Sequence, residues 1–315
     1  MSEEWLERVA NCVSWLSVTI PPGEKILAIN YFQFDRNGYA VIEDFLSAQE
    51  VQGMRDEIEQ ILAQIDVEHY PKVTRTEVVS SDPNKRRIAE DFWLQSCDKT
   101  RLFFEPDALD ENGQLKMELA KSLNKVGHGL HLKPGVFLEL TFSQKVKRLL
   151  KALGYQEPVV VQGQYIFKQP KIGTEFAPHM DATYLYVEPV QNLAGLWFAL
   201  DDCSLENGCL SFVPGSHKVD SVSYRFIRNP DKTGPVMIFQ GEKREFKPED
   251  YEAAPVKKGA CVLIHGLVMH KSEANRSLKS RHAYTFHFIE SRGGVRWSEQ
   301  NWFADYGFAR LDCFK

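Results

Sequence analysis

The sequence predicts an α+β protein in which helices come first and an all-β core, a jelly roll, follows. From about Gly154 onward the chain consists of short β-branched and aromatic segments separated by Gly, Pro and Asn, at the spacing of a β-sandwich or small barrel. Before that point, apolar residues recur with the period of one helix face. The 315 residues are enough for one large domain or two modest ones, and no internal repeat is evident.

The composition is that of an ordinary globular protein, with 43 % hydrophobic and 26 % charged residues. The net charge of −5 and the absence of a long Lys or Arg cluster indicate no nucleic-acid partner. The six Cys residues never occur as C-x-x-C, which favours reduced thiols in an intracellular protein. No 18-residue apolar run exists, and the acidic N-terminus is unlike a secretory signal. We therefore expect a cytoplasmic monomer that acts on a small molecule, away from membranes.

Residues 1–29 are expected to form an N-terminal extension, either a short packing helix or, as we favour, a mobile segment. The remainder, residues 30–315, is expected to be a single domain. Within it, residues 39–46 are predicted to be a strand. Ser47 with Glu50 three residues later is typical of a capping box, and an amphipathic helix is predicted to follow.

The middle of the chain gives weaker signals. Residues 69–117 are charged and irregular, which favours surface loops that cover a site. Residues 121–154 are predicted to be helical, with Gly154 at the C-terminal end. The sequence Glu206-Asn207-Gly208 predicts a hairpin between two strands of the β half. Residues 218–258 are predicted to be a long excursion between core strands.

A candidate metal site begins with His179 and Asp181, two positions apart in APHMDAT. On a strand or strand-like turn, both side chains leave the backbone on the same side. Nitrogen and oxygen ligands of this kind suit iron(II), with manganese, nickel or zinc as competitors. A chain with nine His and 43 acidic residues contains such a pair by chance, so the interpretation depends on further residues.

His270, in the late segment LVMHKS, is the candidate third ligand. Arg281 opens the following strand, RHAYTFHF, after a connection formed by residues 274–280. We expect the two strands to pair antiparallel, which would bring Arg281 close to His270. Ser272 has the same parity as His270 and is expected to point the same way.

These residue types fit one chemistry. Two His and one carboxylate on one face of octahedral iron leave three positions open, two for a chelating 2-oxo acid and one for dioxygen. The far carboxylate of that co-substrate needs a partner, and Arg281 is permanently charged, planar and able to bind a carboxylate with two hydrogen bonds. Ser272 adds a hydroxyl donor. In the related halogenase arrangement a small residue replaces the carboxylate to admit chloride, so Asp181 favours oxygen insertion.

Seven stretches together are more specific than the His-x-Asp pair. They are DRNGYAVIEDFLS, KSLNKVGHGLH, VVVQGQYIFKQP, PHMDATYLY, LWFALDDCSLENGCLSFVPGSHK, GACVLIHGLVMHKSEAN and SRHAYTFHFIE, and they extend over roughly residues 31–303. In these stretches the sequence resembles the phytanoyl-CoA dioxygenase (PhyH) family of iron(II)- and 2-oxoglutarate-dependent oxygenases. The resemblance implies a double-stranded β-helix, the cupin-like jelly roll, with flanking helices. It also implies iron(II), 2-oxoglutarate and dioxygen as cofactor and co-substrates.

The resemblance implies roles residue by residue. His179, Asp181 and His270 would bind the iron and carry catalysis. Arg281 and Ser272 would hold the distal carboxylate of 2-oxoglutarate.

Three further positions, Lys125, Gln164 and Trp197, would line the co-substrate pocket. Gln164 departs from the family pattern, which carries Met there, so an amide takes the place of an apolar contact. Two of these positions also have a simpler interpretation: Lys125 as an exposed helix residue, and Trp197 as plain core. His217 is interpreted as fixing the Pro-Gly turn. The other histidines without an evident partner are interpreted as structural: His128, His131, His265, His282 and His287.

Three functions remain open from the sequence. The first is an oxygenase that hydroxylates a C–H bond of a small organic substrate, acyl-CoA-like molecules included, and releases succinate and CO2. The second is a metal-dependent cupin-type hydrolase or isomerase, which needs the same ligands but not Arg281. The third is a non-catalytic 2-oxoglutarate- or metal-binding sensor, against which the intact ligand set argues.

Overall fold

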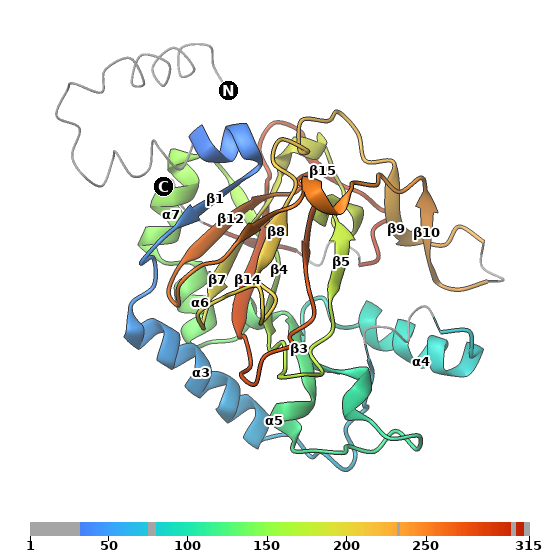
Figure 1. Ribbon diagram of the computed structural model, residues 1–315. Helices are drawn as coiled ribbons and strands as arrows, with labels where there is room; N and C mark the ends of the chain where they lie inside the picture. Colours follow the sequence, from blue (N-terminus) through green and yellow to red (C-terminus); the bar gives the residue numbers. More distant parts are fainter. Residues whose placement is uncertain (1–31, 75–79, 232–233, 304–306, 312–315) are drawn as a thin grey trace.

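A computed structural model describes residues 32–74, 80–231, 234–303 and 307–311 (Figure 1). Its largest sheet has eight antiparallel strands. The order across the sheet is β1 (Tyr39–Ile42), β12 (Cys261–His265), β7 (Leu193–Ala199), β14 (Ala283–Glu290), β4 (Pro158–Ile166), β3 (Leu123–His128) and β2 (Thr100–Phe104), with β16 (Ala309–Arg310) also pairing with β4.

A second sheet, of four strands, lies opposite the large sheet across the interior of the roll. Its order is β11 (Glu252–Ala254), β8 (Leu210–Phe212), β13 (His270–Ser272) and β5 (Phe176–His179). Two small ribbons complete the β structure: β9 (Tyr224–Arg228) with β10 (Met237–Gly241), and β6 (Val187–Glu188) with β15 (Arg296–Trp297). Along the chain, core strands pass from one sheet to the other, as in β7 to β8 and β12 to β13 to β14. This alternation makes the core a jelly roll, as predicted.

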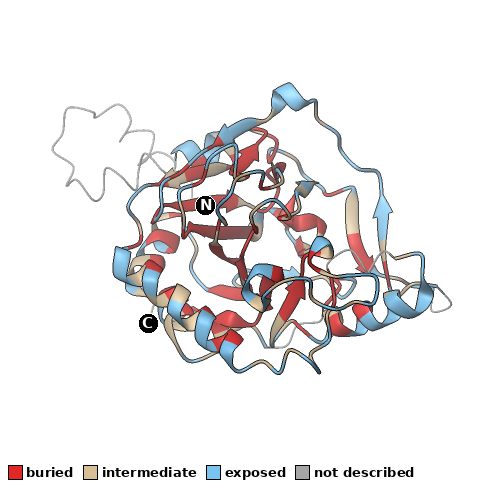
Figure 2. Cartoon of the chain, turned by 60° about the horizontal axis from the view of Figure 1, so that its bottom comes forward, coloured by how far each residue is buried: buried red, intermediate tan, exposed pale blue. Residues whose placement is uncertain are grey.

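Helices cover the outer side of the large sheet and one end of the roll (Figure 1). They are α3 (Ala48–Ala63), α4 (Pro83–Leu94), α5 (Leu119–Ser122), α6 (Val136–Thr141) and α7 (Gln144–Ala152), and the short 3-10 segments are Pro106–Ala108, Leu130–Leu132, Asp181–Thr183, Val190–Asn192 and Pro248–Asp250. Apolar residues of α3, α6 and α7 form one cluster with the outer face of the large sheet. In the burial-coloured view, the central strands are buried while the outward faces of the helices are exposed (Figure 2).

The predicted start of α3 is confirmed. The Ser47 amide donates to Glu50 Oε2 at 2.8 Å, and the Glu50 amide donates to Ser47 Oγ at 3.2 Å, which is the reciprocal capping box. Gly154 is likewise confirmed just beyond α7, where its φ of +88° suits a residue without a Cβ.

The predicted helix over residues 121–154 is wrong in its first half. Residues 123–128 form β3, and all six are buried. This segment lies between β2 and β4 and hydrogen-bonds to both, so tertiary pairing decides its conformation over local preference. Residues 69–117 are also more regular than predicted, since they contain α4 and β2. The strand predicted for 39–46 is shorter and ends at Ile42.

Two predicted strand pairings are wrong for one physical reason. Glu206-Asn207-Gly208 is a turn, but it joins β7 of the large sheet to β8 of the small one, so no hairpin forms. Likewise β13 pairs with β5 and β8, whereas β14 pairs with β4 and β7. Because successive strands of a roll enter opposite sheets, they meet across the interior and not side by side.

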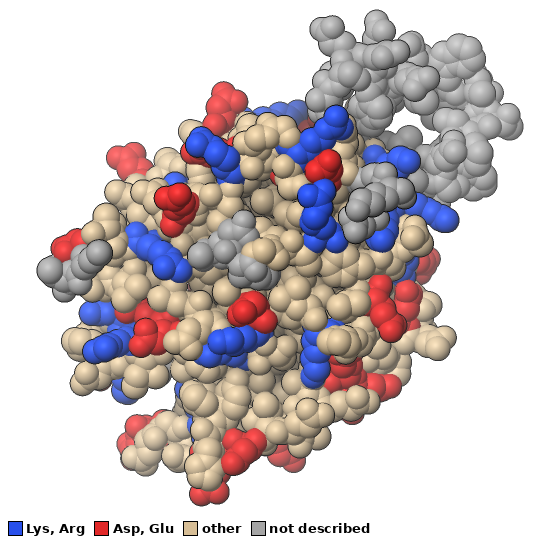
Figure 3. Space-filling model, turned by 180° about the vertical axis from the view of Figure 1, so that it is seen from behind, with Lys and Arg blue, Asp and Glu red and all other residues tan. Residues whose placement is uncertain are grey.

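The segment 218–258 is only partly an excursion, because it contains the β9–β10 ribbon and then β11 of the small sheet. The predicted extension 1–29 lies outside the described residues. Within the described residues, no helix is long and apolar enough to cross a membrane. Those of the Cys residues that are described, at 97, 203, 209 and 261, are all free thiols, as predicted. On the face in Figure 3, basic and acidic side chains are interspersed.

Candidate metal and co-substrate site

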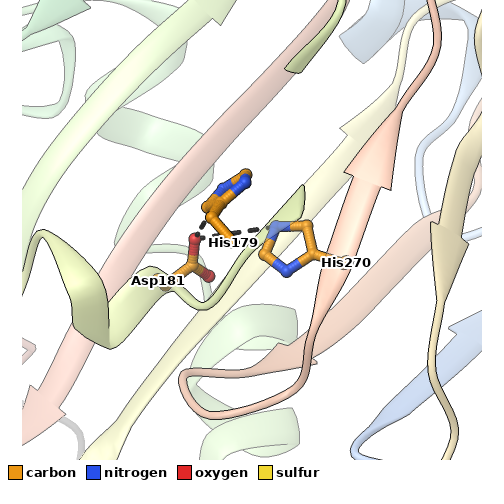
Figure 4. Close-up of side chains that lie close together, drawn as sticks. All are labelled: His179, Asp181 and His270. Carbon is orange, nitrogen blue, oxygen red and sulfur yellow. Dashed lines mark ion pairs between the residues drawn. The ribbon is translucent and has the colours of Figure 1, made fainter. Parts of the chain in front are cut away.

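The three proposed ligands converge between the two sheets (Figure 4). His179 ends β5, Asp181 begins the adjoining 3-10 turn, and His270 begins β13 directly opposite His179. The Nε2 atoms of both histidines lie 3.7 Å from Asp181 Oδ1. One ligand atom from each residue lies within 4.8 Å of the others, as a single metal ion requires.

Backbone contacts orient both imidazoles. His179 Nδ1 lies 2.7 Å from the carbonyl oxygen of Ala177, and His270 Nδ1 lies 3.1 Å from that of Val268. A carbonyl only accepts, so each Nδ1 carries the proton and donates it. In the neutral form of each ring, Nε2 is then the unprotonated nitrogen and faces the carboxylate, which is the tautomer that binds metal.

Asp181 is ionised despite its burial. It is only 8 % exposed, and burial alone would raise its pKa. The surrounding imidazoles, His287 first and then His270 and His179, outweigh burial and hold the pKa of Asp181 well below its usual range. A permanently ionised carboxylate is the form that binds a metal.

His287, interpreted from the sequence as a structural histidine, lies beside the candidate ligand Asp181. Its Nε2 lies 3.2 Å from Asp181 Oδ2, and its Nδ1 lies 3.1 Å from the side-chain amide nitrogen of Gln162. The strand period carried a signal that would have found it. Arg281, Ala283, Thr285 and His287 share one parity, so a pocket role for Arg281 implies the same side for His287.

The sequence places Arg281 near Ser272 correctly, although by the wrong pairing. Arg281 is 1 % exposed, and its Nη2 donates to Ser272 Oγ and to the Gly208 carbonyl, both at 3.1 Å. Its Nε and Nη1 are buried and have no hydrogen-bond partner among the described residues. The Trp197 ring lies 5.1 Å from the guanidinium carbon.

A cavity of about 70 Å³ is lined by both groups of residues. His179, Asp181 and His270 line it, together with Arg281 and Ser272. Two unsatisfied donor nitrogens of a buried guanidinium are expensive unless an acceptor completes them. A carboxylate supplies acceptor oxygens for such donors, so these residues fit an oxo acid bound near a metal.

The three further co-substrate positions are close together but not equivalent. Trp197 lines the small cavity, and Gln164 lines both this cavity and a larger neighbour, whereas Lys125 lines only the larger one. Lys125 is a buried residue of β3 and not an exposed helix residue. Its Nζ lies 3.3 Å from Gln164 Oε1, so a hydrogen bond connects the two.

His128 holds the Lys125 ammonium in place, which the sequence did not reveal. Its Nε2 lies 3.0 Å from Lys125 Nζ, and its Nδ1 lies 2.8 Å from Ser96 Oγ. Burial first, and the Lys125 charge second, hold the pKa of His128 well below its ordinary value. The imidazole is therefore neutral and accepts from the ammonium, which also lies 4.3 Å from the centre of a Trp93 ring.

The larger cavity, of about 440 Å³, opens onto the ligand cluster, because His179 and Asp181 line it too. Seven of the residues that line it are Phe, Tyr or Trp: Trp93, Phe176, Tyr184, Tyr224, Phe226, Phe239 and Trp302. Lys243 and Arg244, which follow β10, contribute exposed positive charge. A cavity of this size accommodates a small organic molecule.

Solved structures with this fold define a class of protein. The non-heme alpha-ketoglutarate-dependent epimerase SnoN superposes with a TM-score of 0.57 at 17 % identity, covering 87 % of this chain and 86 % of that one. EctD from S. alaskensis, solved with 2-oxoglutarate and 5-hydroxyectoine, gives 0.52 at 18 % identity, covering 83 % and 75 %. The chain has the jelly roll of the 2-oxoglutarate-dependent non-heme enzymes.

Sequence relatives then identify the family. Residues 34–283 match the model of Phytanoyl-CoA dioxygenase (PhyH). Phytanoyl-CoA dioxygenase domain-containing protein 1 of Bos taurus is 46 % identical over 272 residues, covering 86 % of this chain and 92 % of that protein. The Arabidopsis thaliana phytanoyl-CoA dioxygenase is 38 % identical over 269 residues, covering 85 % and 90 %. The chain belongs to the phytanoyl-CoA dioxygenase family, so the resemblance is confirmed and the protein is an enzyme of the dioxygenase class.

Proposed function

We propose that this enzyme is an iron(II)- and 2-oxoglutarate-dependent dioxygenase that hydroxylates a C–H bond of a small organic substrate, releasing succinate and CO2. One observation carries the proposal. A single cavity is lined by the His179–Asp181–His270 cluster and by the buried guanidinium of Arg281, two of whose nitrogens have no hydrogen-bond partner among the described residues. A co-substrate with one metal-chelating end and one free carboxylate would bind the metal through the first and Arg281 through the second.

Each group of residues has a stated task. The two Nε2 atoms and Asp181 Oδ1 would hold the iron, and their backbone tethers keep the rings from rotating. Bound together, iron and 2-oxoglutarate supply the oxidising power that activates dioxygen against an unreactive C–H bond. The protein contributes ligand geometry, a pocket closed to water and placement of the substrate.

The co-substrate carboxylate would lie against Arg281, whose charge needs a counter-ion inside the fold. Ser272 Oγ accepts from Arg281 and donates to the Gly208 carbonyl at 2.7 Å, so it fixes the guanidinium plane. Trp197 covers the guanidinium, and Gln164 with Lys125 borders the side toward the larger cavity. In place of an apolar contact, Gln164 would give the co-substrate pocket a polar edge.

The larger cavity would hold the substrate beside the metal. Its aromatic walls suit an apolar body, and the cations Lys243 and Arg244 suit an anionic group. Among the described residues that line this cavity, Asp181 is the only carboxylate. An acyl-CoA-like thioester has both features, as do simpler carboxylates with a long apolar chain.

The reaction class is tested by succinate release. Purified protein with iron(II), 2-oxoglutarate and candidate acids or thioesters should release succinate, and Asp181→Ala should abolish this. Asp202→Ala, which removes an exposed carboxylate, is the matched control and should retain activity. Normal turnover by Asp181→Ala would overturn the proposal. Turnover that needs no 2-oxoglutarate and survives loss of Arg281 would instead identify a hydrolase or isomerase.

The mass of the product shows whether the substrate has been hydroxylated. Hydroxylation adds one oxygen atom to the substrate mass, which mass spectrometry detects. The fold also carries an epimerase and a carbocyclase, so a product without added oxygen would contradict hydroxylation while 2-oxoglutarate is still consumed. Replacing both Lys243 and Arg244 with Glu should raise the KM for an anionic substrate at least about tenfold. The slow succinate release that occurs without any substrate should not change.

A further inference from the structure

We infer that His287 and Gln162 form a positioning pair that keeps Asp181 a ligand through one oxygen only. The two carboxylate oxygens of Asp181 face different partners. Oδ1 faces the Nε2 atoms of the ligand histidines at 3.7 Å, while Oδ2 faces His287 Nε2 at 3.2 Å. His287 itself is only 6 % exposed, so it is a built part of the site and not a surface contact.

The amide of Gln162 sets the tautomer of His287. An amide NH2 can only donate, so His287 Nδ1 accepts from Gln162 Nε2 at 3.1 Å and carries no proton. The ring proton of a neutral His287 is therefore on Nε2, the nitrogen that lies 3.2 Å from Asp181 Oδ2, a buried oxygen that has no hydrogen bond among the described residues. The pair thus presents an N–H donor to the oxygen that the ligand histidines do not face.

The backbone of the large sheet is shaped to hold this ring. Gln162 and His287 are direct cross-strand partners of β4 and β14, and the register shifts immediately after them. Such irregularities re-aim side chains and are common beside active sites. On the other side of β14, His287 pairs with Gly195 of β7. A Cβ at position 195 would lie 3.0 Å from the ring Cδ2 and 3.2 Å from Nε2, so a side chain there would crowd the ring.

Because the two oxygens of Asp181 face different partners, the carboxylate would bind a metal in a particular way. A carboxylate that binds through both oxygens occupies two positions on a metal, whereas one oxygen occupies a single position. With Oδ2 held beside His287 Nε2, the ligand set would fill three of six positions on a metal and would leave three for co-substrate and dioxygen. The inference rests on the proposed metal centre. It assigns His287 to positioning and not to direct contact with the metal.

The test measures metal affinity without turnover. Full-length metal-free protein is titrated anaerobically with Mn(II) by calorimetry, and with Co(II) by its visible absorption, which reports coordination number. His287→Ala should weaken Mn(II) binding about 10- to 100-fold, the range found for partners of metal ligands. His287→Gln keeps an N–H donor and should recover most of that loss. The Co(II) spectrum of His287→Ala should also change.

Two further variants keep the test decisive if His287→Ala does not fold. Gln162→Met removes the donor to Nδ1, and Gly195→Ala crowds the ring. Both should weaken Mn(II) binding although neither changes a ligand. The matched control is Tyr284→Phe, which removes a buried hydroxyl from the opposite face of β14, where it contacts Thr141 Oγ1 at 2.7 Å. It should leave Mn(II) affinity and the Co(II) spectrum unchanged.

The outcomes separate this inference from the proposed function. If the parent protein binds Mn(II) and folded His287 variants bind it equally well with the same Co(II) spectrum, the positioning role is overturned. Failure of the parent protein to bind any divalent metal would overturn the metal centre and the inference with it. A parent protein that binds metal, shows the His287 dependence and does not consume 2-oxoglutarate would overturn the proposed reaction alone.

Discussion

The two faces of β14 are equally buried and chemically opposite. The outer face carries Tyr284, Phe286 and Phe288, all at 0 % exposure, and these pack into the cluster that includes the helices. The inner face carries Thr285 and His287, with exposures of 4 % and 6 %. Burial therefore does not distinguish core from site in this protein. The chemistry of what is buried does, because polar groups are placed inside only where partners or ligands complete them.

The inner face also shows what a site requires of a fold. Arg281, just before the strand, is buried with two donor nitrogens that have no partner among the described residues. Such an arrangement is destabilising until a carboxylate binds. The side chains of the outer face, in contrast, have their packing partners within the chain itself. Stability should therefore depend on the outer face, and ligand binding on the inner face.

The largest expected effect is on the outer face. Phe286→Ala should lower the free energy of unfolding by about 3–5 kcal/mol, because a fully buried aromatic side chain leaves a cavity. Urea denaturation measures this change. Mn(II) affinity of the folded variant should stay within about twofold of the parent. A matching loss of metal affinity would show that the two faces are coupled and would break the comparison.

Arg281→Met, on the inner face, should weaken ligand binding and leave unfolding stability nearly unchanged, which is the reverse of the effect expected for Phe286→Ala. Loss of a buried, hydrogen-bonded cation should weaken 2-oxoglutarate binding at least about 30-fold, corresponding to about 2 kcal/mol or more. Mn(II) affinity should be kept, since the ligands are intact. Unfolding stability without co-substrate should not fall by more than about 1 kcal/mol, because an apolar side chain replaces an incompletely paired charge. Unchanged 2-oxoglutarate affinity in a binding titration would remove Arg281 from the co-substrate site.

Acid should destabilise the protein through a histidine next to Arg281. Burial first, then Arg55 and Arg281, lower the pKa of His282 to about 3. The unfolded chain takes up this proton below about pH 6.5, whereas the folded protein does not. The stabilisation is fully present above pH 6.5 and declines as the pH falls toward 3, reaching about 2 kcal/mol of loss at pH 5.

Unfolding free energies at pH 7.5 and pH 5 measure this dependence. His282→Gln should flatten the dependence by about the same amount. If the variant and the parent lose stability equally, other groups are responsible.

The smallest effect is expected at Trp197. Its ring lies 5.1 Å from the Arg281 guanidinium carbon, a cation–π contact worth about 0.5–1 kcal/mol. Trp197→Phe should raise the KM for 2-oxoglutarate about threefold and leave Mn(II) affinity unchanged. An unchanged KM with reduced unfolding stability would make Trp197 plain core, the alternative that its sequence context also allows.

Local patterns in the sequence were enough for much of the fold. The capping box at Ser47 and Glu50 involves residues three positions apart, so the sequence contains the whole interaction. The same holds for the change from helical to strand periodicity near Gly154. His179 and Asp181 are also local, and the spacing predicted their convergence.

Tertiary structure decided what depends on distant partners. Residues 123–128 are a strand because β2 and β4 lie on either side, and their local sequence does not specify this. Arg281 contacts Ser272 from the opposite sheet, so the proximity was predicted but the pairing was not. The role of His287 depends on a carboxylate and an amide more than a hundred positions away in the chain, and on a glycine in the next strand. Periodicity records only which side of a strand a residue occupies. What lies on that side is fixed when strands from distant parts of the chain pack together and exclude water.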